Sequence, residues 1–339
     1  MRRLNGLVVL IVALGTSCSS GTTDTTSSAV EATSTTTTTT ETSTTTTTTE
    51  TTTAPKTDQG LEIAEEADLV YLTDDEGDWT LRVIYPVEDG SWPLIVVIPP
   101  STGQVAAARE IAKRGAVTVV ADAWTEAGRT DPAPHVYGEM DRAVCVVGWA
   151  QAHAADYGAS AEATTVAGYS GGAMAAAWAG LGLANDAPCL EKMTELPVGL
   201  VLGESQFLFH HSRWDPAFMS GDPEPKATLD GLLNPQRWNV SPDLRVALWS
   251  SRMPLYENRT VENPPAEDSW IWLREAATPV VDDLIALGAF DDERFDFVDN
   301  ALLMESRMKQ GGIDVQSGIY EFGHEYTEEV FDLIFSIQP

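Results

Sequence analysis

The sequence of 339 residues is poor in basic residues, in cysteine and in long apolar runs. Lys and Arg total 20 against 51 Asp and Glu, which gives a formal net charge of −31 at pH 7. Such an acidic surface argues against nucleic acid or an anionic membrane surface as a partner. No glycine-rich loop followed by lysine is present to cradle a phosphate. The adjacent His210 and His211 cannot share a helical face as metal ligands do, so we expect no cofactor and no metal site.

The first eighteen residues have the features of an export signal. Arg2 and Arg3 precede an apolar run over 7–14 that is too short to span a bilayer comfortably, and small residues at 15–17 lead to Cys18. This pattern resembles a bacterial lipoprotein signal peptide, which would place a lipid on Cys18 and anchor the exported protein to the cell membrane. Leu14 stands one place too far from the cysteine for the usual motif, so ordinary cleavage and secretion is the alternative.

The segment over 19–58 is nearly devoid of apolar residues and consists mainly of Thr, Ser and Glu. It cannot offset the entropy of ordering by burying apolar surface, so we predict a disordered linker. Residues 59–339 then form one domain, whose length and apolar content suffice for a full core.

Only two cysteines remain inside that domain, Cys145 and Cys189. An even pair in an exported protein favours a disulfide. Because Cys145 lies on an apolar face with Val146 and Val147, two separate buried thiols are the alternative.

Strands and helices alternate along the domain. This order predicts a mostly parallel sheet of eight strands with helices on both faces, which is an α/β fold. Two longer insertions interrupt it, at about 205–243 and 252–295. The predicted strands are 61–72, 79–85, 93–98, 115–121, 163–169, 198–202, 245–250 and 314–320. The predicted helices are 105–114, 140–157, 173–179, 297–310 and 327–335.

One strand runs directly into Gly168-Tyr-Ser-Gly-Gly172, and a helix follows at once. G-x-S-x-G between a strand and a helix is the pattern of a nucleophile elbow, in which a strained turn presents the serine. The N–H of Gly171 would then face the oxygen on which negative charge develops. The alternative is a Gly-rich turn in which Ser170 only caps the helix.

A serine nucleophile needs a base, and His324 is the best placed of the five histidines. It follows the last predicted strand, at the same edge of the sheet as Ser170, and Phe322-Gly323 could bend the chain back towards that serine. A solvent-exposed loop histidine is the alternative.

Residues 61–339 resemble the α/β-hydrolase fold, and 141–173 with the Gly-Tyr-Ser-Gly-Gly turn resemble the dienelactone hydrolase and carboxylesterase branch. The resemblance implies the chain order nucleophile, acid, histidine, with Ser170 as nucleophile and His324 as general base. The acid usually follows the seventh strand, but residues 249–254 contain no carboxylate. The spacing to the histidine favours Asp292, with Glu257 as the alternative and Glu204 as a third possibility.

The resemblance also implies a second oxyanion donor in the loop after the third strand. Pro99 and Pro100 have no N–H to give, so we expect Ser101 or Thr102 to supply it together with Gly171. Aromatic residues of the first insertion fall where this fold carries a cap over its site, which would favour an apolar or aromatic substrate. Ordinary packing is the alternative. These residues are Phe207, Phe209, Trp214, Phe218 and Trp238.

Two functions are compatible with these residues. The first is a serine hydrolase that cleaves carboxylic esters through an acyl-enzyme, with amide, thioester or polyester bonds as variants of the same chemistry. The second is a catalytically impaired binding or scaffold lipoprotein on the same fold, motivated by the missing acid pattern and by the Pro-Pro sequence in the oxyanion loop.

Overall fold

The structure, a computed structural model, describes residues 60–74, 77–98, 104–121, 136–183, 187, 189–204, 231–251, 254–256, 286, 295–320 and 328–338. The chain divides into two compact units, Met1–Ala54 and Pro55–Pro339. The first unit, which contains Cys18, lies outside the described residues, as do most of the two predicted insertions. The elements below all belong to the second unit.

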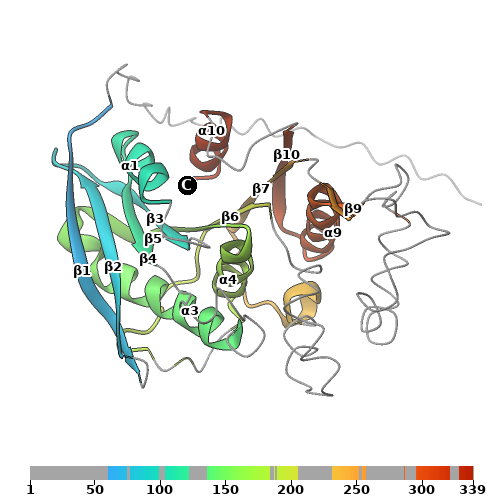
Figure 1. Cartoon of the computed structure of the whole chain (residues 1–339), viewed down its shortest axis with the longest axis horizontal. Coiled ribbons are helices and arrows are strands. Elements are labelled where there is room, and N and C mark those ends of the chain that lie inside the picture. The colour runs from blue at the N-terminus through green and yellow to red at the C-terminus, as the bar shows by residue number, and fades with distance from the viewer. Residues whose placement is uncertain are drawn as a thin grey trace, which may run out of the picture. The chain divides into compact units, whose positions relative to one another are not determined.

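Eight strands form one sheet in the order β1-β2-β4-β3-β5-β6-β7-β10 (Figure 1). Of these eight, β2 alone runs against the others, since it pairs antiparallel with both β1 and β4, and every other pair in the sheet is parallel. The predicted mostly parallel sheet of eight strands is therefore confirmed. The strands are β1 (Ile63–Asp74), β2 (Gly77–Pro86), β3 (Trp92–Ile98), β4 (Val117–Ala121), β5 (Ala159–Tyr169), β6 (Gly199–Gly203), β7 (Arg245–Ser251) and β10 (Asp314–Tyr320).

Helices cover both faces of the sheet. Figure 1 shows α1 (Val105–Lys113) and α10 (Glu328–Ser336) on one side of it, and α3 (Val136–His153), α4 (Gly171–Gly180) and α9 (Phe297–Gln310) on the other. The apolar side chains of each layer form their own cluster with alternate residues of the strands. Shorter elements are the 3₁₀ helices Ala154–Tyr157 and Pro235–Arg237 and a separate pair of strands, β8 (Pro254–Tyr256) and β9 (Phe295–Asp296).

The central strand β3 shows why its sequence is a continuous apolar run. Leu94 and Val96 pack with the α3 and α4 layer, whereas Ile95 and Val97 pack with the α1 and α10 layer. All four side chains are fully buried. A strand covered by helices on both faces has no polar side, so its residues need not alternate in polarity.

Helix α3 is fastened to the segment that leads into β6. Cys145 on α3 and Cys189 form a disulfide, with their Cα atoms 4.9 Å apart. One turn further along the helix, a Cβ at Gly148 would lie 2.3 Å from the carbonyl oxygen of Glu191. The glycine therefore permits a backbone contact that a larger residue would prevent.

Gln151 continues this contact on the same face of α3, three residues beyond Gly148. Its side-chain oxygen accepts hydrogen bonds from the backbone N–H of Thr194 (2.9 Å) and of Glu195 (3.2 Å), and its Nε2 donates to the carbonyl oxygen of Glu195 (2.8 Å). The buried side-chain amide of Gln151 therefore has its hydrogen-bond partners in the backbone of the segment that leads into β6.

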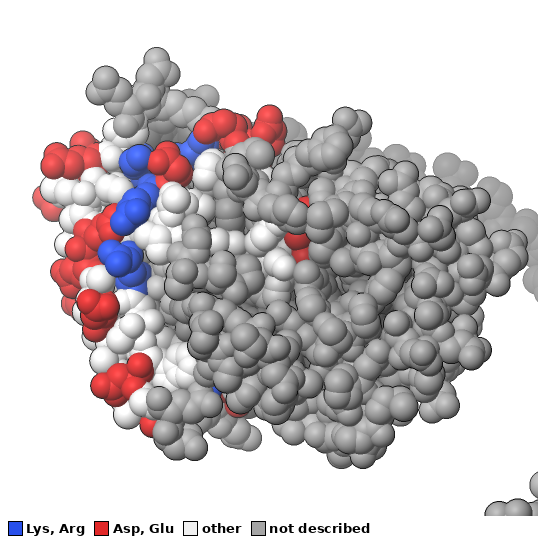
Figure 2. All heavy atoms as spheres, viewed as in Figure 1, with Lys and Arg blue, Asp and Glu red and all other residues white. Residues whose placement is uncertain are grey.

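Ion pairs join the first two strands to α1. Lys and Arg side chains gather in a stripe among acidic ones on this part of the surface (Figure 2). Glu65 on β1 accepts hydrogen bonds from Arg82 on β2 and from Arg109 on α1, the latter through both Nε and Nη2. The hydrogen bond from Arg109 is the main cause that lowers the pKa of Glu65 below its ordinary value, and Arg82 adds to it.

We expect Glu65→Gln to lower the free energy of unfolding by about 0.5–1 kcal/mol at neutral pH, because the two arginines lose a partly exposed anionic partner. Since the folded state lowers the pKa of Glu65, this contribution is complete above the ordinary value of 4.5 and disappears as the pH falls through the lower folded value. Urea unfolding of both proteins at about pH 7 and about pH 3 measures it. Glu62→Gln is the control, and a difference that persists unchanged at the lower pH would refute the assignment.

Candidate active site

Ser170 occupies a sharp turn between β5, which ends at Tyr169, and α4, which begins at Gly171. Its backbone angles are φ 52° and ψ −123°. A serine with φ in this region is strained by about 1–3 kcal/mol, and such strain persists only where the surrounding structure imposes it. The strand before the turn, the strained serine in it and the helix after it are those that the sequence pattern predicts.

The serine side chain does not serve as a helix cap. Ser170 is the N-cap residue of α4, yet its hydroxyl makes no capping hydrogen bond to the first turn of that helix, which is described throughout. Its carbonyl oxygen instead accepts from the N–H of Ala173 at 3.1 Å. Gly171, as the first residue of α4, has a backbone N–H that no carbonyl within the helix can accept. The helix start therefore offers a donor beside the serine hydroxyl.

Gly168 allows the strand to approach the start of the helix. A Cβ at Gly168 would lie 2.3 Å from the carbonyl oxygen of Gly172 and 2.7 Å from the Cα of Ala173. Both contacts are with backbone atoms, which cannot move aside without displacing the turn. The steric reason for glycine at this position, which the sequence pattern implies, is present in the structure.

We expect Gly168→Ala to destabilise the protein by about 1–3 kcal/mol, since the methyl group must push β5 away from α4. The same displacement should slow the reaction of Ser170 with an active-site serine probe. Urea unfolding and the rate of labelling measure the two effects. Gly138→Ala on α3 is the matched control, because the nearest atom to its Cβ lies 3.4 Å away. Equal losses in both variants would contradict the role of the close contact.

The end of β6 packs under an aromatic pair. A Cβ at Gly203 would lie 2.0 Å from the Trp249 ring, so this glycine makes room for the indole. Trp249 stacks with Tyr169 at a centroid distance of 6.1 Å, and both are buried. This contact is not among those that the sequence predicts. The glycine that ends an otherwise apolar strand was the available signal, because glycine inside a strand often marks the close approach of another group.

Glu204 follows Gly203 and is 1% exposed. Its backbone has φ 46°, and its N–H donates to the carbonyl oxygen of Trp249 at 3.0 Å. Burial is the main cause that raises the pKa of the Tyr169 hydroxyl, and the negative charge of Glu204 raises it further. A carboxylate thus lies buried at the sheet edge that carries Ser170.

The structure describes only part of the predicted constellation. Ser170 and Gly171 lie together at the carboxyl edge of the sheet. Of the aromatic residues predicted to form a cap, the structure describes Trp238. It packs against the core cluster and donates its indole N–H to the carbonyl oxygen of Gly231, which is ordinary packing. The remaining site predictions lie outside the described residues: His324, Asp292, Glu257, Ser101 and Thr102.

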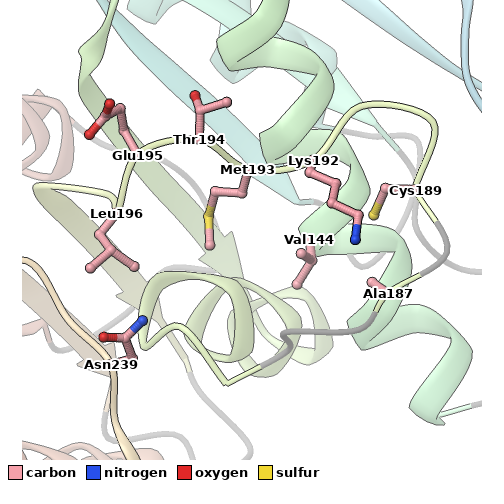
Figure 3. Close-up of a pocket in the computed structure, with 9 residues that line it drawn as sticks. All are labelled: Val144, Ala187, Cys189, Lys192, Met193, Thr194, Glu195, Leu196 and Asn239. Carbon is pink, nitrogen blue, oxygen red and sulfur yellow. The ribbon is translucent and has the colours of Figure 1, made fainter.

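A pocket of about 280 Å³ lies beside the disulfide (Figure 3). It is lined by Val144 of α3, Ala187, Cys189, residues 192–196 and Asn239. Ser170 is not part of its lining.

Within the described ranges, no three His, Cys, Asp or Glu side chains gather as metal ligands would. No helix among the described elements is long and apolar enough to cross a membrane.

No protein-family model matches the chain, and no curated protein matches it. Solved structures do resemble it. Thermogutta terrifontis esterase 2, phosphoramylated by tabun, superposes with a TM-score of 0.50 at 16% identity over 84% of this chain and 95% of that one. The Pyrobaculum calidifontis esterase gives a TM-score of 0.50 at 14% identity over 81% and 83%. At such identities the likeness shows the fold, which together with the strand order is the α/β-hydrolase fold.

Proposed function

We propose that this protein is an exported serine hydrolase that cleaves carboxylic esters. The observation that carries the proposal is Ser170, held at a strained strand-to-helix turn with a hydroxyl that does not cap the helix behind it. A strained backbone conformation at a serine is typical of a nucleophile, whereas a simple turn does not require it. The two structural neighbours named as esterases share the fold, and they support the choice of ester substrates for the test.

In the proposed mechanism, the Ser170 hydroxyl attacks the ester carbonyl while His324 takes its proton. The N–H of Gly171, with that of Ser101 or Thr102, stabilises the oxyanion of the tetrahedral intermediate. His324 then protonates the departing alcohol, which leaves an acyl group on Ser170. Water, activated by the same histidine, releases the acid. A carboxylate orients His324, and the sequence offers Asp292 or Glu257 for that role.

The sequence supports two further parts of the proposal. The resemblance of 141–173 to dienelactone hydrolases and carboxylesterases supports membership of that branch of the fold. The pattern that ends at Cys18 supports a lipid anchor outside the cytoplasm, with secretion after ordinary cleavage as the alternative. With the anchor in place, the Thr-rich segment over 19–58 would hold the hydrolase domain away from the membrane.

The proposal is tested with the purified protein on p-nitrophenyl esters of increasing acyl length, with matching amide and thioester substrates in parallel. We expect ester turnover and covalent labelling by a fluorophosphonate probe. The competing function, a binding protein on the same fold, is motivated by the absence of a carboxylate in 249–254. A folded wild-type protein that neither turns over esters nor accepts the probe would favour that function.

A further inference from the structure

The pocket beside the disulfide has an apolar inner part. Val144 and Ala187 line it with 4% and 8% of their surfaces exposed. Figure 3 shows the side chains of Met193 and Leu196 turned towards the same space. The volume of about 280 Å³ is close to the lower end of the range of ligand pockets, about 300–1,000 Å³. The cavity is therefore suited to a short apolar chain.

The wall of this pocket is fixed to α3 at two points. The disulfide at Cys189 holds one end of the wall. At the other end, the backbone N–H groups of Thr194 and Glu195 donate to the side-chain oxygen of Gln151 at 2.9 and 3.2 Å. Met193 lies between these two anchors. A ligand that enters a pocket with such a wall does not bear the entropic cost of ordering it.

Lys192 places a positive charge at the outer part of the pocket. Its side chain is exposed, and Figure 3 shows its ammonium directed into the pocket near the disulfide, while the carboxylate of Glu195 points away from it. Of the three lysines that the structure describes, Lys113 and Lys309 each pair with a glutamate, whereas Lys192 has no ion pair with a described residue. In a chain with 51 Asp and Glu, this leaves the Lys192 ammonium available to an anionic ligand.

We propose that this pocket binds the anion of a short-chain fatty acid. The carboxylate lies on the Lys192 ammonium, and the alkyl chain lies between Val144, Met193 and Leu196. A charged group at the outer part and apolar side chains further in match the two parts of such a molecule. Because Ser170 does not line the pocket, this binding does not depend on the proposed ester hydrolysis.

The test is a calorimetric titration of the full-length protein with sodium octanoate at low ionic strength. We expect one octanoate to bind per chain with a Kd of about 0.1–1 mM, as for a ligand of this size in a pre-formed pocket. Affinity should fall about fourfold for each methylene group removed, as measured with hexanoate and butyrate, because the alkyl chain is the part that is buried. Octanol, which has the chain without the charge, should bind more weakly than octanoate.

Two substitutions at Lys192 separate this pocket from other sites. Lys192→Gln should raise the Kd for octanoate about fivefold through loss of the charge, and Lys192→Glu should raise it further through repulsion. Lys113→Gln is the matched control, since it removes an exposed lysine that does not line the pocket, and its Kd should not change. Because Lys192 is exposed, both variants should keep the wild-type unfolding midpoint when octanoate is left out.

Equal affinity for octanoate in the wild-type protein and in Lys192→Glu would overturn the inference, because the anion would then lie elsewhere, including at Ser170. Equal affinities for octanoate and butyrate would also overturn it, since the alkyl chain would then not be buried. A wild-type protein with no saturable binding below about 10 mM octanoate would overturn it as well. Binding that depends on Lys192 in a protein that a fluorophosphonate does not label would refute the proposed function and support this site.

Discussion

Ser170→Ala is expected to abolish ester hydrolysis and fluorophosphonate labelling, with a loss in kcat of about 10⁴–10⁶-fold. Alanine removes the only atom that can form the acyl-enzyme, and the backbone donors that remain can stabilise charge but cannot attack a carbonyl. Because φ 52° is costly for any residue with a Cβ, serine and alanine bear similar strain at this turn. The variant should therefore keep the wild-type unfolding midpoint.

Ser160→Ala is the matched control for this experiment, because Ser160 lies near the other end of the same strand. It should retain both labelling and turnover. Intact-mass spectrometry after reaction with the probe would show one adduct on the wild-type protein and on Ser160→Ala, and none on Ser170→Ala. Labelling that survives in Ser170→Ala would place the nucleophile elsewhere and remove the main support for the proposed mechanism.

Loss of the disulfide is expected to have the largest effect on stability. The Cys145–Cys189 bond closes a loop with a sequence separation of 44 residues. By loop-closure entropy, a cross-link of this span stabilises the folded state by about 4 kcal/mol. The double variant Cys145→Ala/Cys189→Ala should therefore unfold at much lower urea concentration. The hydrogen bonds of Gln151 would still hold the segment on α3, so we expect the folded variant to keep the proposed ester turnover at the wild-type level.

Reduction of the wild-type protein by dithiothreitol should reproduce this loss of stability, whereas the same treatment should leave the double variant unchanged. This comparison separates the cross-link from the packing of the two sulfur atoms. Identical unfolding curves for oxidised and reduced wild-type protein would contradict a structural disulfide. The count of free thiols under denaturing conditions gives an independent measure of the bond.

Much of the fold could be predicted because its signals are local. The apolar run of β3 is bounded in the sequence by Pro93 and Pro99, and the bounds of α9 and β10 agree with the predicted 297–310 and 314–320. The nucleophile elbow could be predicted equally well, since Gly168, Ser170 and Gly172 all lie within one turn. Such elements can be recognised from neighbouring residues along the chain alone.

The surroundings of the site could not be predicted in the same way, because they depend on contacts between strands distant in sequence. Gly203 and Trp249 lie on different strands, and only the sheet order brings the indole over the glycine. Likewise, the burial of Glu204 cannot be predicted from its neighbours along the chain. The acid of the triad stays a prediction, because Asp292, favoured by its spacing to His324, and Glu257, the first carboxylate after 249–254, both lie outside the described residues.

The edge strand β1 has a consequence for solubility. Among the described strands it pairs with β2 alone, so the hydrogen-bonding groups of its other side could template a strand from another molecule. Its register shifts twice, after Glu66 and after Val70, and it carries Glu65, Glu66 and Asp68. Bulges and charges of one sign are the means by which natural sheets prevent edge-to-edge association. At high protein concentration, this edge would keep neighbouring copies from joining into a continuous sheet.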